Sequence, residues 1–349
     1  MTGQPLLSVR DLTVTYPRGR RQAPLTALSH VDLDVDEGQT VSVVGESGSG
    51  KSTLGNAILG MVVPTAGTIS FAGEQITYAT RARRRALTRQ IQVVFQDPFG
   101  SLNPARTIGQ TLEEPLLAHQ NLTRQQRSGQ VAAALERVGL SGADAARYPA
   151  SFSGGQRQRI AIARALVPEP RLLVCDEAVS ALDLSIQAQV LNLLRSLQRE
   201  LRLALLFITH DMAVVAHISD RVAVLCQGQL METGSGRDVT ERPLHPCTQL
   251  LVAAAPVPDP AAQRLRQIAV SPLSANPPSA NPLGANPLSA NPLSANPPPR
   301  TGCPFRPRCD HAASVCEQPL PRHTAGTGIV ACHRYAELPP LPVPGGTSR

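Results

Sequence analysis

The sequence predicts an α/β domain followed by a smaller C-terminal region that contains several cysteines. Residues 1–242 alternate strand-like and helix-like segments that are separated by short loops, which is typical of an α/β domain. Most of the 32 prolines lie after residue 242, and four of the seven cysteines lie in residues 301–349. This change of composition predicts a boundary near residue 242.

Composition excludes several classes of protein. The 349 residues suffice for one large domain or for two. No run of 18 apolar residues is present, and the first ten residues lack a basic segment followed by an apolar one. We therefore expect no membrane span and no secretion signal. The net charge of +7 is dispersed and only 3% of the residues are aromatic, so we expect no nucleic-acid partner.

The C-terminal part is divided further by its sequence pattern. We expect a helical extension over residues 243–270, a linker rich in proline and asparagine over 271–300, and a four-cysteine region over 301–349. In the linker an Asn-Pro pair recurs every five residues from Asn276 to Asn296. Proline at this density removes the hydrogen bonds of helices and ladders, which predicts a semi-extended spacer.

A glycine-rich loop follows the apolar, strand-like segment Val41 to Val44. The loop and its flanking residues match the pattern G-x-x-x-x-G-K-[ST] in full: Gly45, Glu46, Ser47, Gly48, Ser49, Gly50, Lys51, Ser52 and Thr53. A helix-like segment follows as far as Leu59. Glycines allow successive N–H groups to face an anion, and the helix N-terminus adds partial positive charge. The pattern predicts a phosphate-binding loop, which transporter motors share with kinases and GTPases.

Two polar side chains of this loop predict the ligand. Lys51 is the only lysine beside 32 arginines, and a compact ammonium on a flexible stem suits the β- and γ-phosphates of a nucleotide. The hydroxyl of Ser52 suits Mg²⁺. We therefore expect the phosphates of a nucleotide and Mg²⁺ as ligands.

A second acidic pair supports this expectation. The apolar strand that begins at Arg171 ends in Asp176 and Glu177. Carboxylates at the end of a buried strand are costly unless they serve a cation or a proton. Asp176 suits the Mg²⁺ shell. Glu177, expected on the opposite face of an extended chain, suits polarisation of the attacking water.

A third motif reads Ser153, Gly154, Gly155 and Gln156. Ser153 and Gln156 have the spacing of a capping box and predict the start of a helix. On local physics alone, this is a second candidate anion site. Because it lies between a phosphate-binding loop and an Asp-Glu strand, the motif resembles the signature of ABC ATPases.

Further residues match this family in order along the chain. The resemblance implies that Tyr16 stacks on adenine, and that Gln96 senses Mg²⁺ and contacts the transmembrane partner. It also implies that Asp183 lies in a loop that crosses the dimer interface, and that His210 contacts the γ-phosphate. Glu177, His210 and Gln96 are the expected catalytic residues.

The family implies a fold and a mechanism. The fold is an ABC-type P-loop NTPase domain with a RecA-like mixed sheet, an N-terminal antiparallel β subdomain and a helical signature subdomain over about residues 107–150. Two such domains pair head to tail, and each ATP lies between the P-loop of one and the signature of the other. Closure around ATP and reopening after hydrolysis move membrane helices.

The C-terminal sequence resembles the ATP-binding subunits of bacterial di- and oligopeptide importers. Residues 244–248 resemble their His-Pro-Tyr-Thr element, with Cys247 in place of tyrosine, and residues 302–309 resemble their C-terminal segment. The resemblance implies two permease subunits, a second ATPase chain that is a homologue or a copy, and an extracytoplasmic peptide-binding protein. It implies a peripheral location on the cytoplasmic face of the cell membrane. Nickel or another small solute is an alternative cargo, and a soluble ABC ATPase without a transport role is an alternative class.

Four cysteines gather in the last region: Cys303, Cys309, Cys316 and Cys332. In a cytosolic chain such a group suggests a metal site before disulfides. The spacing differs from that of a C-x₂-C zinc finger. The resemblance favours a [4Fe–4S] cluster, while zinc and free thiols stay open as alternatives.

Overall fold

The computed structural model describes residues 4–19, 23–97, 100, 102–119, 122–255 and 301–338. The expected linker 271–300 and residues 256–270 of the expected helical extension lie outside these ranges. The strands are β1 (Leu7–Tyr16), β2 (Leu25–Val35), β3 (Thr40–Val44), β4 (Ala66–Phe71), β5 (Glu74–Gln75), β6 (Ile91–Val94), β7 (Leu172–Asp176), β8 (Ala204–Thr209), β9 (Arg221–Cys226), β10 (Gln229–Ser235), β11 (His323–Ala325) and β12 (Gly328–Val330). The helices are α1 (Lys51–Leu59), α2 (Arg81–Gln90), α3 (Ile108–His119), α4 (Arg124–Arg137), α5 (Gly154–Leu166), α6 (Leu184–Leu201), α7 (Met212–Ile218), α8 (Gly236–Glu241) and α9 (Pro246–Ala254).

The larger sheet has the order β11-β12-β10-β9-β3-β8-β7-β6 in the described residues. Its central strands β9, β3, β8, β7 and β6 are parallel, whereas β10, β11 and β12 pair antiparallel. Every residue of β3 and β8 is buried, as continuous apolar strands of a covered parallel sheet require. The carboxyl ends of β3, β7 and β8 meet at one edge, which is where such sheets bind ligands.

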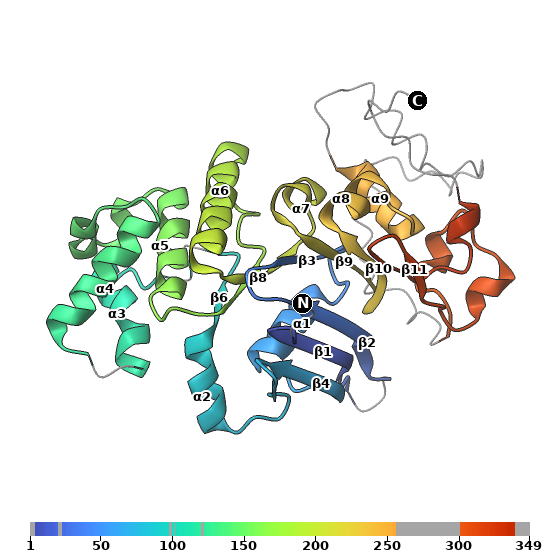
Figure 1. Ribbon diagram of the computed structural model, residues 1–349, viewed down its shortest axis with the longest axis horizontal. Helices are drawn as coiled ribbons and strands as arrows, with labels where there is room; N and C mark the ends of the chain where they lie inside the picture. Colours follow the sequence, from blue (N-terminus) through green and yellow to red (C-terminus); the bar gives the residue numbers. More distant parts are fainter. Residues whose placement is uncertain are drawn as a thin grey trace.

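The smaller sheet is antiparallel, has the order β2-β1-β4-β5, and lies beside the larger one (Figure 1). Its apolar side chains form one core with α1 and with the strands of the larger sheet; Leu7, Leu12 and Ile69 share this core with Leu54 and Ile58. The two sheets confirm the predicted mixed-sheet core with an N-terminal antiparallel subdomain.

A helical part, formed by α3, α4 and α5, projects from the sheet at the left of Figure 1. Its core joins Leu112 of α3, Leu135 of α4 and Ile160 of α5 to Phe207 of β8. Helices α3 and α4 fall within the expected subdomain of about residues 107–150. Among the described residues, no helix combines the length and apolar character needed to span a bilayer.

The C-terminal region packs on the end of the larger sheet. Strand β12 pairs with β10 through Glu232 opposite Val330 and Thr233 opposite Ile329. This pairing satisfies backbone groups that an edge strand would otherwise expose. Strands β11 and β12 of the C-terminal region are therefore part of the sheet that carries the phosphate-binding loop.

Candidate functional site

The phosphate-binding loop joins β3 to α1, as the sequence predicts. All three glycines of the loop have positive φ, and two of them, Gly45 with φ 156° and Gly50 with φ 103°, also lie against neighbouring backbone. A Cβ atom would lie 2.2 Å from the carbonyl oxygen of Leu225 at the first position and 2.5 Å from that of Ala27 at the second. At these two positions the loop therefore fits against its neighbours only without a side chain.

Lys51 occupies the first turn of α1 and is 5% exposed. Its Nζ atom donates to the carbonyl oxygens of Gly45 and Glu46, both at 2.8 Å. Burial lowers the pKa of Lys51, while the charges of nearby acidic groups oppose the shift. The ammonium is held at the inner wall of the loop, within reach of a phosphate placed there.

Asp176 and Ser52 meet at the carboxyl end of β7. Ser52 Oγ donates to Asp176 Oδ1 at 3.3 Å. Burial raises the pKa of Asp176, and the neighbouring Glu177 charge adds to the rise. A hydroxyl and a carboxylate beside a phosphate loop form the oxygen pair that Mg²⁺ prefers.

The expectation that Glu177 continues an extended chain is wrong. Strand β7 ends at Asp176, and Glu177 adopts φ 48°. Its N–H donates to the carbonyl oxygen of Ile208 at 2.9 Å, which turns the chain toward the end of β8. There Glu177 Oε1 lies 3.1 Å from Nδ1 of His210. The left-handed turn therefore pairs the acid with the histidine.

Tyr16 and Gln96 occupy the positions expected of them in the chain, but their roles stay predictions. Tyr16 ends β1, is half-buried and packs against the core of the smaller sheet. Gln96 is exposed in the loop after β6. Among the described residues, neither side chain forms a hydrogen bond with Lys51, Ser52 or Asp176.

The signature motif begins α5 with the predicted capping box. Ser153 Oγ accepts from the N–H of Gln156 at 3.3 Å, and Gln156 Oε1 accepts from the N–H of Ser153 at 3.0 Å. Gly155 packs so closely that a Cβ atom would lie 2.5 Å from Ile186 Cγ2. Asp183 caps α6 by accepting from the N–H of Ile186 at 2.9 Å. Within one chain, the signature motif lies in the helical part, at the start of α5, whereas the phosphate-binding loop lies just before α1 (Figure 1).

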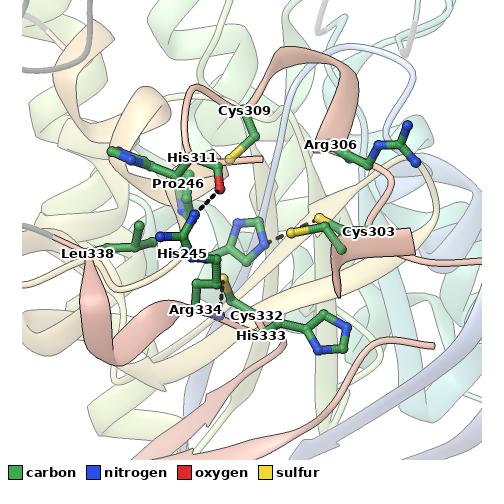
Figure 2. Close-up of a pocket in the computed structure, with 11 residues that line it drawn as sticks. His245, Pro246, Cys303, Arg306, Cys309, His311, Cys332, His333, Arg334 and Leu338 are labelled. Atoms are coloured by element: carbon green, nitrogen blue, oxygen red, sulfur yellow. Dashed lines mark hydrogen bonds between the residues drawn. The ribbon is translucent and has the colours of Figure 1, made fainter. Parts of the chain in front are cut away.

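The four C-terminal cysteines line one pocket, drawn in Figure 2. The same pocket is lined by His245, Pro246, Arg306, His311, His333, Arg334 and Leu338. Cys303, Cys316 and Cys332 are buried, Cys309 is half-buried, and no cysteine forms a disulfide. Burial raises the pKa of Cys303 to about 12, and it also raises the pKa of Cys309 and Cys332.

His245 is a pocket residue to which sequence reasoning gave no role. Two N–H groups, of Leu244 and His245, donate to the buried carboxylate of Glu232 at 3.0 and 2.8 Å. The His245 ring accepts from the N–H of Cys247 at its Nδ1 atom, at 3.0 Å, and its Nε2 atom lies 3.8 Å from Cys303 Sγ. Burial lowers the pKa of His245 to about 4. The neutral ring therefore carries its proton on Nε2, facing the sulfur.

The cysteine pocket fits a thiolate-ligated group by its donors. Four thiols from one segment converge on it, with Arg306 and Arg334 in the same wall. Within the described ranges, however, no three His, Cys, Asp or Glu side chains stand in metal-coordinating positions. The donor set is present and the coordination geometry is not.

Comparison with known proteins identifies the family. The family model described as ABC transporter matches residues 28–180, and the model of the oligopeptide/dipeptide transporter C-terminal region matches residues 231–316. A peptide import ATP-binding protein of Brucella ovis is 46% identical over 322 residues, which cover 92% of this chain and 95% of the relative. This chain belongs to the ATP-binding subunits of ABC transporters. The ABC subunit is accordingly an ATPase that uses ATP and Mg²⁺.

Other relatives place the ABC subunit in the same family. The glutathione import ATP-binding protein GsiA of Escherichia coli is 48% identical over 274 residues, which cover 77% of this chain and 44% of GsiA. Among solved structures, cbiO1 from Clostridium perfringens superposes with a TM-score of 0.61 at 28% identity, covering 68% of this chain and 91% of cbiO1. A dimeric ATP-binding cassette bound to ADP and Pi gives a TM-score of 0.60 at 29% identity, covering 66% and 99% of the two chains.

Proposed function

We propose that the ABC subunit energises the import of di- and oligopeptides by hydrolysing ATP between two ATPase domains. The observation that carries this proposal is the convergence of two polar pairs beside the phosphate-binding loop. Ser52 and Asp176 form one pair, and Glu177 and His210 form the other. The two pairs supply a cation site and a base at the same edge of the sheet.

Each pair has a separate task in this proposal. The loop amides and Lys51 bind the β- and γ-phosphates, and Ser52 and Asp176 hold Mg²⁺ with help from Gln96. Glu177 accepts a proton from the attacking water, and His210 orients Glu177 and contacts the γ-phosphate. Tyr16 stacks on adenine. The positioning of these groups before ATP arrives limits the reorganisation needed for hydrolysis.

ATP-binding subunits of ABC systems act with membrane permeases and as dimers. We propose that the Ser153–Gln156 motif of one subunit completes the site of the other, with Asp183 at the interface. The amides at the N-terminus of α5 would then share the γ-phosphate with the phosphate-binding loop. The proposed location is the cytoplasmic face of the membrane, with two permease subunits and an extracytoplasmic binding protein.

The peptide cargo is supported by the relatives. One is named for peptide import and another for glutathione import, and glutathione is itself a tripeptide. Nickel and a role outside transport are not favoured by these names. Uptake of labelled dipeptides into proteoliposomes that contain the permease and receive its binding protein would test the assignment. The peptide assignment would be contradicted if a metal complex stimulated ATP hydrolysis and peptides did not.

The catalytic assignment is tested by Glu177→Gln. Glutamine keeps the shape of the side chain but is a far weaker base. Hydrolysis should therefore fall about 10²- to 10⁴-fold, while ATP binding is retained. The mutant should elute as an ATP-dependent dimer, and Lys51→Ala should lose both binding and dimerisation. Turnover near the wild-type rate would refute Glu177 as the base.

We also propose that Cys303, Cys309, Cys316 and Cys332 hold a [4Fe–4S] cluster. When bound, the cluster supplies positive iron centres that displace the thiol protons. The chain's own part is to gather four thiols at the pocket, with His245 Nε2–H donating toward Cys303. Such a donor stabilises negative charge on a ligating sulfur.

Metal analysis tests this assignment directly. Protein purified under anaerobic conditions should be brown and contain about four iron and about four sulfide per chain. The variant in which Cys303 and Cys316 are both replaced by serine should be colourless, while Cys175→Ser should keep the colour, because Cys175 lies in β7 away from the pocket. Colourless wild-type protein with stoichiometric zinc would overturn the cluster.

A further inference from the structure

An ion pair joins the cysteine region to the phosphate-binding loop. The guanidinium of Arg308 donates to both carboxylate oxygens of Glu46, with Nη1–Oε2 at 2.5 Å and Nη2–Oε1 at 2.8 Å. The two residues are 262 positions apart in the sequence. This fork-to-fork geometry is the strongest form of a surface ion pair.

Both the backbone and the side chain of Glu46 form hydrogen bonds. Its backbone carbonyl accepts from Lys51 Nζ at 2.8 Å, while its carboxylate accepts from Arg308. The carboxylate belongs to a loop that must receive a polyanion. Left unpaired, it would repel the phosphates of a nucleotide, so its neutralisation favours nucleotide binding.

Contacts within the C-terminal region hold Arg308 in place. Its guanidinium lies over the ring of Phe305, 5.5 Å from the ring centre, and the backbone N–H of Arg308 donates to the Phe305 carbonyl oxygen at 2.9 Å. Phe305 is 4% exposed and meets the His245 ring edge-on at 6.1 Å. The side chain that binds Glu46 therefore packs on Phe305, which shares an apolar cluster with Cys303 and Cys316.

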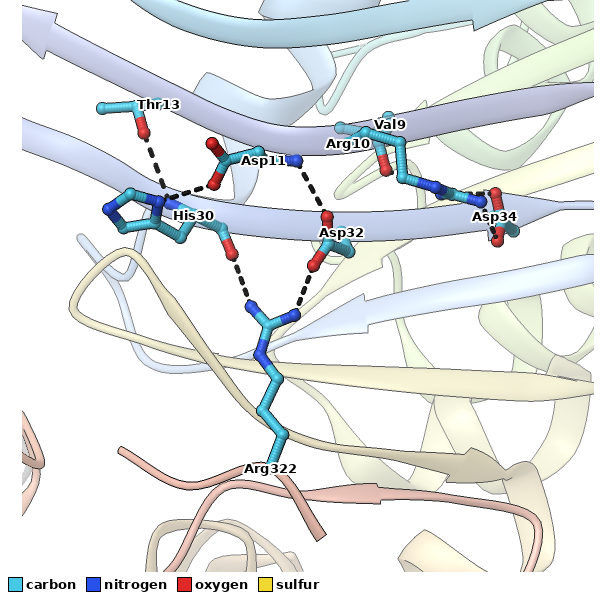
Figure 3. Close-up of polar contacts among 8 residues, drawn as sticks. All are labelled: Val9, Arg10, Asp11, Thr13, His30, Asp32, Asp34 and Arg322. Atoms are coloured by element: carbon cyan, nitrogen blue, oxygen red, sulfur yellow. Dashed lines mark hydrogen bonds and ion pairs between the residues drawn. The ribbon is translucent and has the colours of Figure 1, made fainter. Parts of the chain in front are cut away.

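A second arginine provides a comparison. Arg322 forms an ion pair with Asp32 of β2 and donates to the carbonyl oxygen of His30 at 2.8 Å (Figure 3). Side-chain exposure is similar in the two links, 45% and 30% for Arg308 and Glu46 against 47% and 37% for Arg322 and Asp32. Both arginines tie the C-terminal region to the N-terminal half, but Arg322 contacts the antiparallel sheet and not the phosphate-binding loop.

We propose that Arg308 is a positioning residue for the ATPase reaction, acting through Glu46. It fixes the second residue of the phosphate-binding loop and cancels a negative charge beside the incoming phosphates. The C-terminal region thereby contributes to nucleotide affinity without touching the nucleotide. This inference rests on the proposed phosphate-binding role of residues 45–53.

The test compares Arg308→Gln, Glu46→Gln, the double variant and the control Arg322→Gln in the full-length chain. The affinity for a fluorescent ATP analogue with Mg²⁺, the KM for ATP and kcat are measured for each. Arg308→Gln should raise Kd and KM about three- to fivefold and change kcat less than about twofold. Arg322→Gln should leave all three values at the wild-type level.

The double variant separates positioning from simple tethering. Because the repelling carboxylate is gone, Arg308→Gln should have little further effect on affinity once Glu46 is glutamine. An equal loss in the Arg322→Gln control, or an undiminished loss in the Glu46→Gln background, would overturn the inference. A wild-type chain that bound no nucleotide would instead refute the proposed function itself.

Discussion

At the scale of single residues, Asp176 is half-buried at the carboxyl end of β7. Burial raises the pKa of Asp176, and the charge of the neighbouring Glu177 adds to the rise. A raised pKa in the folded state means that the ionised carboxylate destabilises the fold. The penalty is present above the folded pKa, decreases as the pH falls through it, and is absent below the unfolded pKa.

Asp176→Asn should therefore stabilise the protein without Mg²⁺ while abolishing hydrolysis. The amide oxygen can still accept from Ser52, and the charge is gone. Because Asp176 is only half-buried, solvent screens its charge, and we expect a gain of at most about 1 kcal/mol at pH 7.5. In a chain of this length that gain is equivalent to about 1 °C in Tm. The gain should shrink as the pH is lowered toward 4. Thermal melts of both proteins between pH 4 and 8 check this, and a gain independent of pH would contradict the argument.

The residues of the site were predictable to different degrees. Lys51, Ser52 and Asp176 lie where their motifs predict, because each motif fixes local backbone and all three end at one sheet edge. The left-handed turn at Glu177 was not predictable, since it depends on a hydrogen bond to Ile208 in the neighbouring strand. The Arg308–Glu46 pair joins segments that no local pattern connects.

At the scale of elements, neighbouring backbone limits which residues the phosphate-binding loop can contain. Gly48 and Gly50 both have positive φ, 78° and 103°. A Cβ atom on Gly48 would meet nothing within 4 Å, whereas one on Gly50 would lie 2.5 Å from the Ala27 carbonyl oxygen. A side chain would therefore strain the backbone at both positions, but it would clash with a neighbour only at Gly50.

Alanine at these two glycines should thus have unequal effects on stability. Gly48→Ala should cost about 1 kcal/mol, the usual penalty for a left-handed residue. Gly50→Ala should cost about 3 kcal/mol, because the backbone at Ala27 must also move. Urea denaturation of the nucleotide-free proteins measures both. Equal losses would show that the clash is relieved at no cost.

The elements themselves followed largely from sequence. The capping box at Ser153, the helix after the loop and the buried strands β3 and β7 were all predicted from apolar runs and cap chemistry. The pairing of β12 with β10 was not, because three-residue strands carry too little pattern. The expected linker 271–300 lies outside the described residues and stays a prediction.

At the scale of the whole molecule, the cysteine region is attached through a close backbone approach. At Gly328 a Cβ atom would lie 1.7 Å from the carbonyl oxygen of Thr233 in β10. Only glycine allows β12 to reach the sheet. The same region covers an apolar cluster that contains Met231, Cys226 and Phe305.

Gly328→Ala should therefore detach this edge of the sheet. We expect a loss of about 3 kcal/mol and increased binding of a hydrophobic dye as the cluster opens. Gly326→Ala is the matched control: its φ is 55° and nothing lies within 4 Å of its Cβ position, so about 1 kcal/mol should be lost. Hydrogen exchange in β10 should rise only in the first variant, and unchanged exchange there would contradict the docking role of Gly328.

The solitary lysine also has an experimental consequence. Since Lys51 is the only lysine of the chain, acylating reagents can modify one side-chain amine alone, and that amine lies in the loop that is proposed to take the triphosphate. Loss of labelling on adding Mg-ATP would therefore report directly that nucleotide occupies the site, and mass spectrometry could measure this loss in the intact transporter. Conversely, amine-directed crosslinking will reveal little about the neighbours of this subunit, and carboxyl- or arginine-directed reagents are needed to map them.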